Sequence, residues 1–240
     1  MPTGQPKITR RARWRPPPDQ LAKQIGQKAL GSFGAAVTQD AINPETQYAD
    51  LRFEPDPARQ AERERLGLLG RLAASACIIE AYSDAPNAEE FRACLTKHLT
   101  LWQQRVRDAR SESKKREPQP REASAASFLW IIAAGAPTTL LAKLKLEHSA
   151  DWPAGIYLLG DDVLRVGIVV ASQLPRDRTT LLVRLMAAGP LLPPAVKEVA
   201  ALPPDAYERS VAEPILLRFQ YMLGQGPTQD ANEQESSWPC

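Results

Sequence analysis

Two acidic residues stand inside otherwise apolar segments, and their types and spacing suggest chemistry. Asp50 lies in the segment at residues 48–53, and Glu80 lies in the segment at residues 77–82. Because burying an unpaired carboxylate is costly, each acid should either meet a cation or lie at an open end of a sheet. Carboxylate oxygens are preferred ligands of Mg²⁺ and Mn²⁺. If the two segments are neighbouring strands, the pair predicts a divalent metal site that activates water for attack on a phosphodiester.

A purely structural role for the same two acids is the alternative. Glu80 would then end its strand in water, and Asp50 would pair with an arginine such as Arg52 or Arg71. Residue types alone leave both interpretations open, because a carboxylate at a strand end serves either purpose.

Other familiar catalytic patterns are absent from the sequence. It contains no GxxxxGK[ST] loop, no GxGxxG after a strand and no CxxC pair. The two histidines, His98 and His148, have no partners at the spacing of zinc ligands. His98 falls near the centre of a predicted apolar helix face, so we expect a packed histidine with a hydrogen bond. Cys77 and Cys94 fall at predicted buried positions, which favours small core residues over nucleophiles.

Charged residues are unevenly distributed along the 240-residue chain, which carries a formal net charge of +2. Residues 1–18 hold five basic residues and no acidic one, and residues 105–127 hold seven basic and four acidic residues. The remainder of the chain therefore carries 18 basic and 24 acidic residues, out of 30 and 28 in total. The body of the protein is acidic, and its basic character lies in an arm and an insertion.

The basic arm at residues 1–18 predicts contact with nucleic acid. Basic side chains neutralise phosphates, and an aromatic ring among them can stack on a base. An exposed terminus that only aids solubility is the alternative. The candidate nucleic-acid ligands are Arg10, Arg11, Arg13, Trp14 and Arg15.

The segments between the two ends predict one α/β domain at residues 19–224. Charge, proline and serine without apolar periodicity predict a mobile insertion at residues 105–127 and a disordered polar tail at residues 225–240. The longest apolar run, at residues 128–136, has nine residues, whereas a bilayer span needs about 20. Three cysteines without a disulfide pattern, and no secretory signal, favour a cytoplasmic protein with no membrane partner.

Alternating extended and helical patterns predict a mixed central sheet with helices on both faces. Residues 128–133 are the most apolar segment and predict a central buried strand, flanked by strands at residues 77–82 and 164–170. Residues 155–159 should form a hairpin with the last of these strands. Helical patterns begin at Asp19 and at Asn87, and also cover residues 58–74, 137–146, 179–187, 194–201 and 206–223.

The order of these elements resembles the core of the PD-(D/E)XK, or restriction-endonuclease-like, superfamily. That order is a helix, the strand with Asp50, the strand with Glu80, an amphipathic helix and an apolar strand. The chain is also similar to uncharacterised bacterial proteins related to recombination-promoting nucleases and transposase-associated proteins. The similar stretches are NPETQYAD at residues 43–50, LGLLGRLA at residues 66–73, FLWII at residues 128–132 and QLPRDRTTLLVRL at residues 173–185.

This resemblance implies a Mg²⁺- or Mn²⁺-dependent DNA nuclease in which Asp50 and Glu80 hold the metal. Tyr82 stands where the family motif has Lys or Gln, and it would orient water or a phosphate. Lys97 of the following helix is a substitute for the motif lysine, but its place about 120° from the apolar stripe predicts a side chain pointing away from the sheet. Ala49 replaces the proline of the motif. A non-catalytic binding or assembly module that keeps the fold is therefore the alternative function. The sequence does not indicate an oligomeric state.

Overall fold

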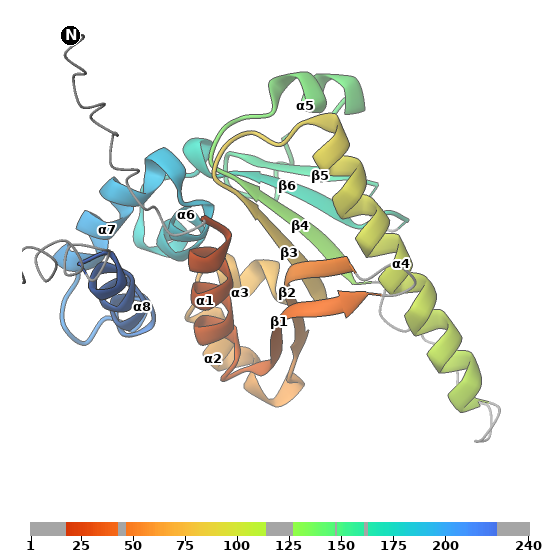
Figure 1. Cartoon of the computed structure of the whole chain (residues 1–240), viewed down its shortest axis with the longest axis horizontal. Coiled ribbons are helices and arrows are strands. Elements are labelled where there is room, and N and C mark those ends of the chain that lie inside the picture. The colour runs from red at the N-terminus through yellow and green to blue at the C-terminus, as the bar shows by residue number, and fades with distance from the viewer. Residues whose placement is uncertain (1–17, 43–46, 114–126, 147, 161–162, 225–240) are drawn as a thin grey trace, which may run out of the picture.

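Six strands form one mixed sheet in the order β1-β2-β3-β4-β6-β5 (Figure 1). The computed structural model describes residues 18–42, 47–113, 127–146, 148–160 and 163–224. Neighbouring strands are antiparallel in the pairs β1–β2, β2–β3 and β5–β6, and parallel in the pairs β3–β4 and β4–β6. The strands are β1 (Gly34–Ile42), β2 (Gln47–Pro55), β3 (Cys77–Tyr82), β4 (Phe128–Ala133), β5 (Ile156–Leu159) and β6 (Val166–Val170).

Helices cover both faces of this sheet, as predicted (Figure 1). Helices α1, α3 and α6 lie on one face, α4 crosses the other, and α7 and α8 pack outside α1 and α6. The α-helices are α1 (Pro18–Leu30), α2 (Gln60–Glu64), α3 (Leu68–Leu72), α4 (Ala88–Ser113), α5 (Thr138–Leu144), α6 (Leu181–Ala187), α7 (Leu192–Ala201) and α8 (Tyr207–Gly224). Short 3₁₀ turns are η1 (Pro57–Arg59), η2 (Ala171–Gln173), η3 (Arg178–Thr180) and η4 (Gly189–Leu191).

Strand β4 is the predicted central strand, and it runs parallel to both of its neighbours, β3 and β6. Its side chains are buried on both faces because a hydrophobic cluster lies on each side of the sheet. Trp130 stacks on Phe128 with ring centroids 4.2 Å apart, and its indole N–H donates to the Leu72 carbonyl at 2.8 Å. Gly167 of β6 leaves room for this ring, since a Cβ there would lie 2.1 Å from it.

The chain between β2 and β3 departs from the prediction of one helix at residues 58–74. It forms α2 and α3, which are separated at Gly67, where φ is +60°. A side chain at Gly67 would also come within 2.5 Å of the Thr179 carbonyl oxygen. The break therefore follows from a backbone conformation and a close approach that favour glycine.

Helix α4 is longer than predicted, so the boundary of the insertion at residue 105 is wrong. The helix continues to Ser113, and Arg105 forms an ion pair with Glu54 of β2. Ser127, at the other predicted end, is fully buried just before β4. Residues 114–126 of the predicted insertion lie outside the described residues, as do residues 1–17 of the arm and the tail at residues 225–240.

The predicted start of α4 is confirmed by its hydrogen bonds. The Asn87 side chain accepts from the backbone N–H groups of Glu89 and Glu90 at 2.8 and 3.0 Å, and the Glu90 carboxylate accepts from the Asn87 N–H at 2.7 Å. This reciprocal arrangement satisfies backbone donors that the first turn leaves open. At α1, the helix begins at Pro18, so Asp19 lies in its first turn and not before it. Among the described residues, no helix is both long enough and apolar enough to cross a membrane.

Candidate functional site

Strands β2 and β3 bring Asp50 and Glu80 together, as the sequence predicted for neighbouring strands. Their antiparallel register pairs Leu51 with Ile79, and extending it by one residue places Asp50 opposite Glu80. Glu80 and Ile78 lie on the face of β3 that α4 covers, since side chains two apart share a face. The two acids therefore meet at one end of the β2–β3 pair.

Backbone groups hold both carboxylates in place. The Ala81 N–H donates to Asp50 Oδ2 at 3.1 Å. The Glu80 carboxylate in turn accepts a hydrogen bond from the backbone of Asp50. Each carboxylate thus accepts a hydrogen bond from the backbone of the partner strand. The two side chains therefore take part in the pairing of β2 with β3.

Two lysines from opposite faces of the sheet neutralise the acids. Lys97 of α4 places its ammonium nitrogen 3.1 and 3.0 Å from the two carboxylate oxygens of Glu80. Lys23 of α1 lies 3.3 Å from Asp50 Oδ1. The site is therefore a row of four charged groups, with the two acids adjacent in the middle and a lysine at each end, from α1 and from α4.

The prediction that Lys97 points away from the sheet is wrong. It took Trp102 as part of the buried stripe of α4, but Trp102 and Leu99 are exposed. The side chains that face the sheet include Phe91, Cys94, His98 and Leu101, which shifts the stripe so that Lys97 flanks it at about 80° from its centre. From there the flexible stem of a lysine reaches a buried carboxylate.

Glu80 does not end its strand in water, as the structural alternative required, because only 3% of the residue is exposed. Burial raises the pKa of its carboxyl group to about 7, and the neighbouring charge of Asp50 adds to the increase. The ammonium of Lys97 and the hydrogen bond from the Asp50 backbone act in the opposite direction. The net increase means that burial and the second acid outweigh the lysine.

Asp50 pairs with a lysine and not with either arginine of the structural alternative. Arg52 lies 3.6 Å from Glu54 on the same strand. Arg71 donates to the Asp151 carbonyl at 2.6 Å and covers the Trp152 ring. Lys23 is the site residue that sequence reasoning missed, because nothing in the pattern of α1 distinguished it from other surface lysines.

Tyr82, the third predicted site residue, lies two residues after Glu80 on the same face of β3. Its hydroxyl is 3.1 Å from Cys94 Sγ, and burial is the main cause that raises the pKa of the phenol. Tyr82 therefore keeps its proton and is available as a hydrogen-bond donor, not as a base.

The histidine and cysteine predictions are confirmed. His98 is buried with Nε2 2.9 Å from the Leu164 carbonyl oxygen, and burial lowers its pKa. Cys77 and Cys94 are buried free cysteines, and burial raises the pKa of each thiol to about 12. Burial and a raised pKa are typical of small core residues and not of reactive thiols.

Asp50 and Glu80 are the two side chains that would hold a divalent cation, one that takes few protein ligands. Within the described part of the chain, no three His, Cys, Asp or Glu side chains are grouped to hold a metal. Mg²⁺ is commonly bound by one or two carboxylates, with water and phosphate oxygens in the remaining positions. Two carboxylates whose charges repel each other, as the raised pKa of Glu80 reflects, suit such an ion.

Two surface hollows lie near this region. A groove of about 610 Å³ lies between α1, β1 and α8 and includes Lys23 in its lining. A second hollow of about 360 Å³ lies beside the start of α4 and α5 and includes Asn87, Thr138 and Lys143. Neither is lined by Asp50 or Glu80, so the first groove approaches the acids only through Lys23.

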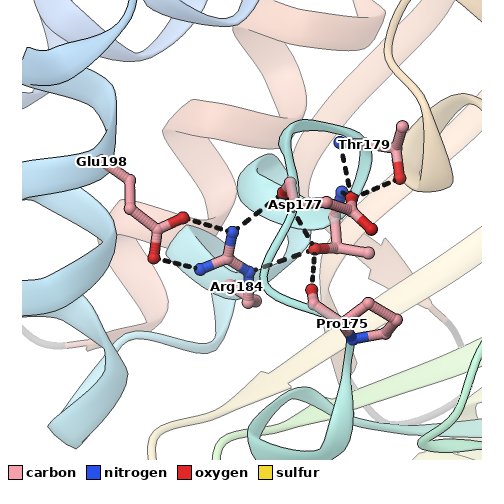
Figure 2. A network of polar contacts seen from close by, with 6 residues as sticks. Pro175, Asp177, Thr179, Arg184 and Glu198 are labelled. Atoms are coloured by element: carbon pink, nitrogen blue, oxygen red, sulfur yellow. Dashed lines mark hydrogen bonds and ion pairs between the residues drawn. The ribbon is translucent and has the colours of Figure 1, made fainter.

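A separate polar network surrounds Arg184 of α6 (Figure 2). This buried guanidinium donates two hydrogen bonds to Glu198 at 2.7 and 2.6 Å, one to Thr180 Oγ1 at 3.1 Å and one to the Asp177 carbonyl at 3.0 Å. The hydrogen bond from Arg184 also lowers the pKa of Glu198. The guanidinium of Arg184 has partners on every side. The polar residues around it therefore have a structural role and do not form a second candidate site.

The five predicted nucleic-acid ligands of the arm, Arg10, Arg11, Arg13, Trp14 and Arg15, lie outside the described residues. No family model matches the chain, and no curated protein or solved structure matches it. Function is therefore inferred from the residues at the site.

Proposed function

We propose that this chain is a Mg²⁺-dependent nuclease-like protein acting on DNA, in which Asp50 and Glu80 hold the metal and Lys97 replaces the motif lysine. One observation carries the proposal: the Lys97 ammonium lies 3.0 Å and 3.1 Å from the Glu80 oxygens. An aspartate, a glutamate and a lysine thus meet at one point, although the Glu-x-Lys spacing is absent from the sequence.

The order of elements gives further support. The chain runs α1, β1, β2 with Asp50, α2, α3, β3 with Glu80, α4 with Lys97 and then β4 parallel to β3. This is the order that the resemblance to the PD-(D/E)XK superfamily implies, with β1 added before the Asp50 strand and with α2 and α3 added between the two acidic strands.

Each residue has a separate task in this proposal. Mg²⁺ or Mn²⁺, when bound, polarises the phosphodiester and lowers the pKa of the attacking water. Asp50 and Glu80 are oriented by backbone N–H groups and so present fixed oxygens. The Lys97 ammonium supplies positive charge beside the phosphate, and electrostatic stabilisation of this kind is strong where water is excluded. Tyr82 keeps its proton and supports α4 through Cys94.

The test is cleavage of supercoiled plasmid and of labelled single-stranded DNA with Mg²⁺, with Mn²⁺ and with chelator. Wild type should cleave only with metal, and Asp50→Asn, Glu80→Gln and Lys97→Met should each reduce the rate at least about 100-fold. Glu213→Gln is the matched control, since Glu213 is a carboxylate that pairs with Arg209 on α8. Cleavage that survives Asp50→Asn, or no metal-dependent cleavage by folded wild type, would overturn the proposal.

A specific observation favours a second function, a non-catalytic binding or assembly module. Lys23 and Lys97 already balance the charges of the two acids, and Glu80 is almost fully buried. In such a module the lysines replace the metal permanently. Thermal unfolding with and without Mg²⁺ separates the two functions, because an ion that binds only the folded state raises the midpoint. The nuclease requires a rise that Asp50→Asn abolishes, and the module requires none.

DNA contact by the arm is part of the proposal and has its own test. Arg10, Arg11, Arg13 and Arg15 lie within six residues with Trp14 among them. Deleting residues 1–18 should weaken DNA binding and flatten its salt dependence by about 0.7–0.9 log units for each phosphate that the arm neutralises. Equal affinity and equal salt slope after the deletion would remove the arm from the DNA-binding surface.

A further inference from the structure

The groove between α1, β1 and α8 has an unusual lining for an acidic protein body. Its volume is about 610 Å³, and of the described residues that line it, three are basic and none is acidic. Among the same described residues, three glutamines and one threonine add polar groups, and Ile215 is the apolar member. The lining residues are Gln20, Lys23, Gln24, Gln27, Lys28, Thr38, Ile215 and Arg218.

Helix α1 arranges most of these side chains along one line. Gln20, Gln24, Gln27 and Lys28 recur at the three- and four-residue spacing that places side chains on one helix face. From Gln20 to Lys28 this line is about 12 Å long, given the rise of an α-helix. One strand of duplex DNA carries a charge about every 3.4 Å of helix axis, so a line of this length spans more than one of its phosphates. Lys28 and Arg218 are the cations that the groove offers them, whereas Lys23 is paired with Asp50.

The chemistry of the lining selects among ligand classes. A small-molecule site is mostly apolar with a few placed polar groups, whereas polar and basic residues predominate in the described lining of this groove. Lysine and arginine neutralise phosphates, and phosphate contacts supply most of the affinity for nucleic acid. Glutamine amides both donate and accept, so they can bond to phosphate, sugar or base edges along the same strand.

Lys23 connects the groove to the acids. It lines the groove and also lies 3.3 Å from Asp50 Oδ1. Its side chain is 13% exposed, and that of Asp50 is 20% exposed. Asp50 does not line the groove, so a strand lying there would meet it across the Lys23 side chain.

We propose that this groove binds the phosphate backbone of a DNA strand and leads it to Asp50. The part of this inference that concerns delivery to Asp50 rests on the nuclease function, whereas binding in the groove does not.

Binding is tested without catalysis, by fluorescence anisotropy of labelled single-stranded and duplex DNA in EDTA at several salt concentrations. The double variant Lys28→Gln/Arg218→Gln should bind at least about 10-fold more weakly, and its salt slope should fall by about 1.4–1.8 log units because two phosphates are no longer neutralised. Lys143→Gln/Lys197→Gln removes the same charge from exposed positions outside the groove and should bind like wild type. Thermal unfolding of each variant confirms that it is folded.

The outcomes separate the groove from the chemistry. Weaker DNA binding by the groove variant alone supports DNA binding in the groove. This holds even if wild type fails to cleave DNA with Mg²⁺, because that failure would overturn only the proposed nuclease function. Equal binding and equal salt slopes for wild type and the groove variant would overturn the groove, even if Asp50-dependent cleavage is found. An equal decrease in affinity for both double variants would also overturn it, because binding would then follow net charge. The single-stranded and duplex probes identify whether the bound strand is free or part of a duplex.

Discussion

Replacing Glu80 with glutamine should change how stability depends on pH, and the size of the change follows from the burial of this carboxyl group. Its pKa is raised from 4.5 to about 7, chiefly by burial and further by Asp50. Folded wild type therefore holds a proton on Glu80 between about pH 4.5 and 7, whereas the unfolded chain releases it. Stability from this source is complete below pH 4.5 and is lost as the pH rises through 7.

The expected loss is about 3 kcal/mol, from a pKa difference of about 2.5 at about 1.4 kcal/mol for each pH unit. Glutamine has the same shape and does not titrate, so Glu80→Gln should avoid this loss. The free energy of unfolding of the variant, measured relative to wild type, should rise by about 3 kcal/mol from pH 4.5 to pH 8. Because Asp50 is coupled to Glu80, the midpoint belongs to the pair of acids.

The assay is urea unfolding at half-unit pH steps between 4.5 and 8, in chelator and at constant ionic strength. Glu213→Gln is the control: Arg209 lowers the pKa of Glu213, so its contribution changes below pH 4.5 and not in this window. The contrary result is that the free energies of unfolding of wild type and Glu80→Gln stay parallel within about 0.5 kcal/mol across this pH range. That result would refute the raised pKa of Glu80 and the burial of its carboxyl group.

Three further substitutions test the packing that positions the site, each by urea unfolding. Trp130→Phe should cost about 2 kcal/mol, because it leaves the buried Leu72 carbonyl without its donor; an effect below about 0.5 kcal/mol would show that this hydrogen bond is unimportant. Arg184→Met should also cost about 2 kcal/mol, less than for a fully buried pair because Glu198 is 34% exposed, and a neutral result would contradict the network in Figure 2. Asn87→Ala should cost about 1 kcal/mol by uncapping α4, whereas Asn87→Ser should restore most of it; equal effects of both would argue against capping.

The sheet was predictable where one pattern dominates over a whole segment. The uninterrupted apolar run of β4 predicted a central strand, and helices on both faces explain why it shows no alternation. Strand β1 was not predicted, since its sequence GAAVTQDAI is neither strongly apolar nor clearly alternating. It is held by its partner β2, and such tertiary pairing overrides a weak local preference.

The candidate site was predictable in its acids and not in its cations. Asp50 and Glu80 stood out because carboxylates are unusual in apolar strands. The side chain of Lys97 was predicted to point away from the sheet because the buried stripe of α4 was centred on the wrong residues. Moving the centre of the stripe by about 40° around the helix brings the side chain within reach of Glu80. Lys23 comes from α1, which contacts β2 only in the folded chain. The spacing of residues in the sequence therefore could not predict the ion pair of Lys23 with Asp50.

Binding of Mn²⁺ to the folded protein tests the central claim most directly, that Asp50 and Glu80 hold a divalent cation. Electron paramagnetic resonance counts free Mn²⁺ during titration of wild type, Asp50→Asn and the control Glu213→Gln. We predict one bound ion per chain for wild type and for the control, displaced by excess Mg²⁺, and none for Asp50→Asn. No bound Mn²⁺ in wild type, or equal binding by Asp50→Asn, would contradict the metal site.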